Sequence, residues 1–200
     1  MGQVTCDIGI SLDGYSAGPN QSVDQPFGDG VGDGERLHAW MFEHADAHAD
    51  ELAAIVAADA FVMGRNMFGP GRGEWDPAWR GWWGDDPPYH APVFVVTHHP
   101  REPVVMDGGT TFHFVTGGVD EALARAREAA GDGDVSVAGG ATTVNEFLAA
   151  GLLDELRLHV APVVLGVRGW ERLFDGVGPL GLTAVAARHT PEVTHLTYRR

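Results

Sequence analysis

The sequence contains no lysine, so its 13 basic side chains are all arginines, and 28 aspartates and glutamates bring the net charge to −15. Proteins that bind nucleic acid or acidic membrane surfaces need a basic face, which this composition does not favour. An anionic ligand would have to be met locally, by arginine, histidine or backbone N–H groups. We therefore expect neither a nucleic-acid nor a membrane partner.

Cysteine is almost absent as well, because Cys6 is the only one in the chain. A single cysteine excludes a disulfide within the chain and a cysteine-rich zinc site. Cys6 lies in an alternating, strand-like run, where we expect a small core residue. No apolar run approaches the roughly 20 residues of a membrane-spanning helix, and the N-terminus lacks a signal-peptide pattern. We expect a cytoplasmic protein.

Strand and helix patterns alternate along most of the chain, and its length and composition suit one globular domain over residues 1–200. Strands are predicted at 3–10, 60–64, 93–97, 110–116, 135–138 and 155–165, and helices at 35–44, 46–58, 121–130 and 143–150. Two further strand-like runs, 182–188 and 193–199, predict a terminal antiparallel hairpin. The pattern predicts an α/β fold with three layers, in which a mostly parallel, twisted sheet has helices on both faces.

One short stretch, VSVAGGATTVNEFLAAG (135–151), carries the clearest local signal. Gly139 and Gly140 separate a buried strand from a helix that Thr143 and Glu146 would open as a capping box. The free N–H groups of a helix start attract anions, above all phosphate. The stretch therefore predicts a phosphate site, with a tight strand-to-helix turn of no further function as the alternative.

Two other strand ends carry unusual residues, MGR (63–65) and VVTHHP (95–100). In sheets of this kind, ligands bind at the carboxyl ends of the strands. Together with the Gly-Gly stretch, three strand ends are therefore candidates for contact with a ligand.

These strand ends, together with SLDGYSAG (11–18) after the first strand, resemble in their order the dihydrofolate reductase-like superfamily. AFVMGRNMF looks like the family's Gly-Arg turn, and APVFVVTHH looks like the strand that meets the adenosine of the cofactor. The run from Val135 to Gly166 looks like the Gly-Gly turn with its helix and the next strand. The closer match is the branch that includes the reductase domain of bacterial riboflavin biosynthesis.

The resemblance implies that the chain binds NADPH as a hydride donor. It assigns the cofactor's pyrophosphate to Gly139, Gly140, Ala141 and Thr142, and the adenosine ribose with its 2′-phosphate to Thr97, His98 and His99. Gly64 and Arg65 would form a second turn, where the guanidinium meets phosphate as a planar fork. The alternatives are a surface salt bridge for Arg65 and a polar strand end for His98 and His99.

The implied reaction passes a hydride to a small heterocyclic, carbonyl or imine substrate, of the kind that 5-amino-6-(5-phosphoribosylamino)uracil represents. Tyr15 stands where riboflavin-pathway enzymes carry a substrate-binding lysine, so the substrate stays open. The alternative is a non-catalytic NADPH-binding protein or a dimeric scaffold of the same fold.

A reduction also needs a proton, and Asp13 and Glu35 are the predicted catalytic acids. A carboxylic acid in this role needs a raised pKa, which burial would supply. For Asp13 the other interpretation is a turn residue in Leu-Asp-Gly.

Two clusters remain. His44 and His48 lie four residues apart on a predicted helix, but no third ligand is evident, so we predict no metal site. Trp75, Trp79, Trp82 and Trp83 crowd one loop, where they could cover the core, form a dimer interface or wall a flat substrate. With the open sheet edge and the family's habit, the tryptophans lead us to expect a homodimer.

Overall fold

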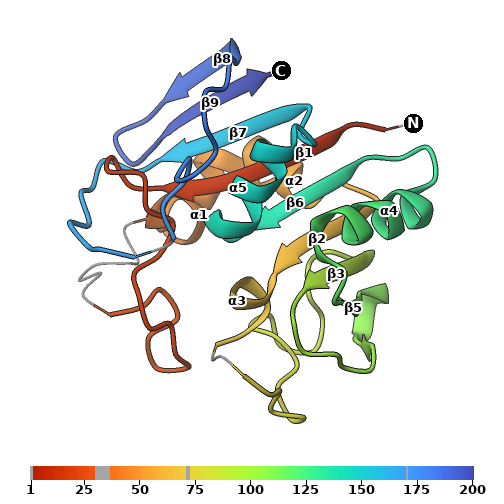
Figure 1. Ribbon diagram of the computed structural model, residues 1–200. Coiled ribbons are helices and arrows are strands. Elements are labelled where there is room, and N and C mark those ends of the chain that lie inside the picture. Colours follow the sequence, from red (N-terminus) through yellow and green to blue (C-terminus); the bar gives the residue numbers. More distant parts are fainter. Residues whose placement is uncertain (1, 30–36, 71–72, 170) are drawn as a thin grey trace.

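The computed structural model describes residues 2–29, 37–70, 73–169 and 171–200 and contains a nine-stranded sheet (Figure 1). The strands are β1 Val4–Ile10, β2 Ala60–Gly64, β3 Pro92–Val96, β4 Val104–Val105, β5 Thr111–Val115, β6 Val135–Gly139, β7 Glu155–Val160, β8 Thr183–His189 and β9 Thr194–Arg199. Their order across the sheet is β4-β5-β3-β2-β6-β1-β7-β9-β8. Neighbours from β5 to β7 are parallel, whereas β4 and the β8–β9 hairpin pair antiparallel.

Helices cover both faces of the sheet, which confirms the predicted three-layer α/β fold (Figure 1). They are α1 Ala39–Phe42, η2 Ala45–His48, α2 Ala49–Ile55, α3 Arg65–Phe68, η3 Asp107–Gly109, α4 Gly118–Ala130 and α5 Ala141–Ala150. One face packs against α4 and α5. On the other face, α1 and η2 lie over β7 and β9, where Trp40 and His48 contact histidines of both strands.

The central strands are apolar on both faces because both faces are covered. Between the sheet and α4 and α5 lies a core that includes Val137, Phe147 and Cys6, and the prediction that Cys6 is a core residue is confirmed. On the opposite face, a second core forms around Phe61 and Phe112.

The tryptophan-rich loop belongs to this second core. Trp75, Trp79 and Trp83 are partly buried and pack against it, and Trp82 contacts the ring of Trp79 edge-on. Of the interpretations open at the level of sequence, covering the core is the one that the structure favours.

Several predicted boundaries are wrong for local reasons. The helix expected over 46–58 is divided into η2 and α2, so exposed His44 precedes η2 and does not share a helix face with buried His48. β7 ends at Val160 and not at residue 165, because Pro162 lacks the N–H that a further ladder bond needs. The two residues of β4 are too few to carry a periodic signal.

Among the described residues, no strand pairs with the outer side of β8, which is the last strand of the sheet. β8 pairs with β9 on one side, and every one of its residues is exposed. An unpaired edge of this kind offers backbone groups to another strand. None of the described helices is long and apolar enough to cross a membrane.

Candidate active site

The Gly-Gly turn joins strand and helix more tightly than the sequence suggested. β6 ends at Gly139, Gly140 is the N-cap, and α5 begins at Ala141. No side chain caps the helix, so the predicted capping box of Thr143 and Glu146 is wrong. Gly140 has no side chain that could cap α5, and a helix start without a side-chain cap suits an anion better than a capped one.

Glycine is needed here for conformation and for space. Gly139 has φ +116°, which side-chain-bearing residues rarely adopt, and the peptide that joins it to Gly140 is cis. Gly139 is buried, but a Cβ on it would meet nothing within 4 Å, so the side-chain position is open space. At the end of β2, a Cβ on Gly64 would collide with the Thr143 hydroxyl. The two turns therefore lie against each other at the carboxyl ends of the neighbouring strands β2 and β6, which is the edge of the sheet where the candidate site lies.

Arg65 begins α3 directly after Gly64 and has unused donors. Its guanidinium lies 3.7 Å over the ring of Trp75 and donates one long hydrogen bond, of 3.5 Å, to the Glu74 carbonyl. Its Nε and Nη1 atoms are buried and have no hydrogen-bond partner among the described residues. Burial lowers the pKa of Arg65, but arginine stays charged at neutral pH. Buried cationic donors without partners fit a phosphate.

The predicted adenosine end follows β3. Thr97 is buried, and its hydroxyl accepts a hydrogen bond of 3.1 Å from the backbone N–H of His99. The His99 carbonyl in turn accepts a bond of 2.7 Å from the indole of Trp75. Thr97 therefore stabilises the turn after β3. Of Thr97, His98 and His99, only His98 is exposed.

Asp13 organises its loop. Its carboxylate accepts hydrogen bonds from the Ser11 hydroxyl at 2.6 Å and from the backbone N–H groups of Leu165 and Gly166 at 3.0 and 2.9 Å. Burial raises the pKa of Asp13, but these hydrogen bonds outweigh it and hold the pKa below its usual value. The structure favours an ionised anchor, and catalysis by Asp13 stays a prediction. Glu35 lies outside the described residues.

Glu171 is a buried acid in this region that no sequence motif marks. Only 5% of its surface is exposed. Its Oε1 accepts a hydrogen bond of 3.4 Å from the Asn66 amide, and its carbonyl accepts one of 2.9 Å from the N–H of Ser16. Its Oε2 lies 2.9 Å from the place of a Cβ on Gly140. Glu171 thus joins the 11–18 loop, α3 and the Gly-Gly turn.

The segment that carries Glu171 is fastened on two sides. On α5, the Asn145 amide donates to the carbonyl of Arg172 at 2.9 Å and accepts from the N–H of Phe174 at 2.7 Å. Arg172 also donates to the Asp13 carbonyl at 3.0 Å. These bonds fasten the residues that follow Glu171 to α5 and to the 11–18 loop, and so hold its carboxylate at the turn.

A hollow of about 480 Å³ opens along α5 beside this region. It is lined by Thr142, Asn145, Glu146, Ala149, Gly169, Asp175 and Gly176. Two carboxylates in its wall make it a poor place for phosphate.

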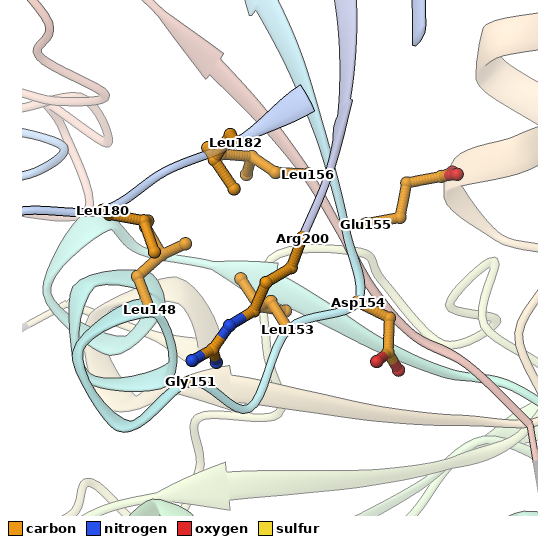
Figure 2. A pocket seen from close by; sticks show the side chains of 9 residues that line it. All are labelled: Leu148, Gly151, Leu153, Asp154, Glu155, Leu156, Leu180, Leu182 and Arg200. Carbon is orange, nitrogen blue, oxygen red and sulfur yellow. The ribbon is translucent and has the colours of Figure 1, made fainter. Parts of the chain in front are cut away.

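A second hollow lies away from this edge, among leucines of α5, β7 and the segment before β8, with Arg200 beside Gly151 (Figure 2). Its volume of about 10 Å³ is room for one water molecule at most, so it is no substrate site.

The sequence from residue 3 to residue 196 matches the model of the RibD C-terminal domain family. No curated protein matches the chain significantly.

Solved structures share the fold. A protein described as a candidate riboflavin biosynthesis protein from Shewanella sp. PV-4 is 23% identical, with a TM-score of 0.62 over 99% of this chain and 98% of that one. A pyrimidine reductase-like protein from Corynebacterium diphtheriae is 14% identical, with a TM-score of 0.57 over 99% and 91%.

A larger relative is the deaminase/5-amino-6-(5-phosphoribosylamino)uracil reductase of Thermotoga maritima. It is 17% identical, with a TM-score of 0.58 over 99% of this chain. The chain spans only 56% of that protein's length. At identities of 14–23%, the similarity to these three structures shows a shared fold.

Proposed function

Because the chain belongs to the RibD C-terminal domain family, we propose that it is an NADPH-dependent reductase of a small heterocyclic, carbonyl or imine compound. The observation that carries the proposal is the pair of adjoining turns at the edge of the sheet. One turn leaves open space where a side chain of Gly139 would lie, and the other holds buried donors of Arg65 that have no partner among the described residues. Open space beside cationic donors is what a dinucleotide phosphate needs.

The residues at this edge fit such a cofactor. The pyrophosphate would be held by Gly139, Gly140, Ala141 and Thr142. The second turn, with Gly64 and Arg65, would also contact phosphate. The adenosine ribose and its 2′-phosphate would lie at Thr97, His98 and His99. NADPH supplies a hydride when it is bound. Arg65, whose guanidinium lies 3.7 Å over the ring of Trp75, would meet phosphate oxygens as a planar fork.

Glu171 extends the set of acids for the proton step beyond Asp13 and Glu35. Its Oε2 lies beside Gly140, at the proposed phosphate turn, so we expect the reacting end of the substrate to lie close to this turn. Its fixed position at Gly140 lets it hold a proton at Oε2 and donate it to the reduced substrate.

A turnover screen tests the proposal. The full chain would be mixed with NADPH and with single pteridines, aminopyrimidines and simple imines, and the loss of NADPH absorbance followed. Turnover of one class that Gly140→Val abolishes supports the reductase. Binding of NADPH without turnover of any compound indicates the non-catalytic NADPH-binding alternative, and absence of binding indicates a scaffold.

A further inference from the structure

Three histidines form a buried row on the face of the sheet that α1 and η2 cover, away from the Gly-Gly turn. His159 of β7 and His195 of β9 approach through their Nδ1 atoms at 2.7 Å, and His195 Nε2 lies 2.9 Å from Nδ1 of His48. At the inner end, His159 Nε2 lies 3.3 Å from a carboxylate oxygen of Asp7. The ring of Trp40 packs against all three imidazoles.

The outer end of the row includes a carboxylate. Glu51 Oε1 lies 3.9 Å from His195 Nε2, and one ligand atom from each of His48, Glu51 and His195 lies within 4.8 Å of the other two. His48 and Glu51 are three residues apart across the junction of η2 and α2. The cluster thus unites one turn of helix with the strand β9.

We propose that His48, Glu51 and His195 bind a divalent transition-metal ion of the zinc class. Two imidazoles and one carboxylate are a ligand set that zinc accepts in proteins, with a fourth position left for water. Metal–ligand distances of about 2.0–2.1 Å place the ligand atoms of a tetrahedral site about 3.3 Å apart. The observed spacing comes close to this, so small side-chain rotations would complete the site.

The inner residues of the row would orient the ligands. A histidine that binds metal through Nε2 carries its proton on Nδ1 and needs an acceptor there. For His195 that acceptor is His159, which in turn donates through Nε2 to Asp7. Asp7 also lies 3.3 Å from the guanidinium of Arg157. A hydrogen-bonded row that ends on a carboxylate is what fixes a metal-binding histidine in place.

Arg188 of β8 now supplies the positive charge at the mouth of the cluster. Its Nη1 lies 2.7 Å from Glu51 Oε1 and 3.3 Å from His48 Nδ1, and its Nη2 donates to the Ala47 carbonyl. Its side chain is 46% exposed and can turn into solvent. A metal ion and Arg188 therefore compete for the same ligands, so loss of the arginine should strengthen metal binding.

The test is a titration of the full chain with Co²⁺, followed by visible absorption, and with Zn²⁺, followed by calorimetry. We expect one ion per chain and the visible band of a low-symmetry Co²⁺ site. Glu51→Gln should remove binding, and His159→Gln should weaken it by about 10- to 100-fold. Arg188→Gln should tighten it by roughly two- to fivefold, as expected for the loss of an exposed ion pair. The matched control is His90→Ala, which alters an exposed histidine that lies 3.7 Å from Asp86.

Circular dichroism of each variant shows whether it is folded. The proposal is judged by whether the metal affinity of each folded variant rises or falls. Tighter binding in Arg188→Gln cannot come from unfolding. Absence of saturable binding in the wild type overturns the proposal. So does binding that survives in folded Glu51→Gln, that weakens in Arg188→Gln, or that is lost in His90→Ala.

Discussion

The carboxylate of Glu171 lies 2.9 Å from the place that a Cβ atom would take on Gly140. A buried acid and the backbone of the turn between β6 and α5 therefore meet with no side chain between them. Whatever enters here must pass beside open backbone and within reach of a fixed carboxylate. This contact ties the proposed cofactor site to the proposed proton donor.

A side chain at position 140 should block this space. Gly140 has φ −71°, which any residue adopts, so Gly140→Val should fold but push against Glu171 and the approaching phosphate. We expect NADPH affinity to fall by at least about tenfold, or 1.4 kcal/mol. Circular dichroism and a fluorescence titration measure the two effects. Gly181→Val, at a position with nothing within 4 Å, is the control and should bind NADPH normally.

Removing the charge of Glu171 should raise the affinity for NADPH, whereas Gly140→Val should lower it. Glu171→Gln keeps the shape of the side chain and removes a negative charge near the proposed phosphate site. We expect NADPH to bind about two- to tenfold more tightly, because like charges repel strongly in a partly enclosed site. Glu146→Gln alters an exposed acid on α5 and should change the affinity less. Weaker binding in Glu171→Gln would remove Glu171 from the site.

The fold could be predicted from the sequence because its signals are local. Apolar runs mark the central strands, and two adjacent glycines mark the turn after β6. Glu171 could not be predicted, since its place at the turn depends on long-range bonds, such as those of the next residue, Arg172, to Asn145 and Asp13. The same holds for His195 and His48, which are 147 residues apart and meet because β9 returns beside β7.

Acid should destabilise the protein through buried histidines. Burial, with help from the charge of His159, lowers the pKa of His38 from 6.5 to about 4. Between these values only the unfolded chain takes up the proton, so the stability falls as the pH falls through this window. His195, with a pKa lowered to about 4 by burial and by His159, adds to the effect.

Urea unfolding at about pH 7 and about pH 5 measures this loss of stability. His38→Gln should lose less stability than the wild type over the same interval, because one titrating group is gone. An equal loss in both proteins would show that His38 does not titrate as its burial implies.

The chain should form a homodimer through apolar contacts. β8 leaves its edge and the side chain of Val185 exposed, whereas the tryptophans pack inward. A net charge of −15 repels a second copy, and salt screens that repulsion, so the dimer should persist at high ionic strength. Light scattering at low and high salt gives the mass, and Val185→Asp should weaken association. A monomer in both buffers would contradict the prediction.

The central claim is that the edge of the sheet at Gly139 and Arg65 binds the phosphates of NADPH. A fluorescence titration of the wild type and of Arg65→Gln with NADPH and with NADH tests it most directly. We predict that the wild type prefers NADPH and that Arg65→Gln loses about 10-fold or more of its NADPH affinity, as expected for hydrogen bonds to a charged group. Equal affinity for both nucleotides, or an unchanged affinity in Arg65→Gln, would contradict the account.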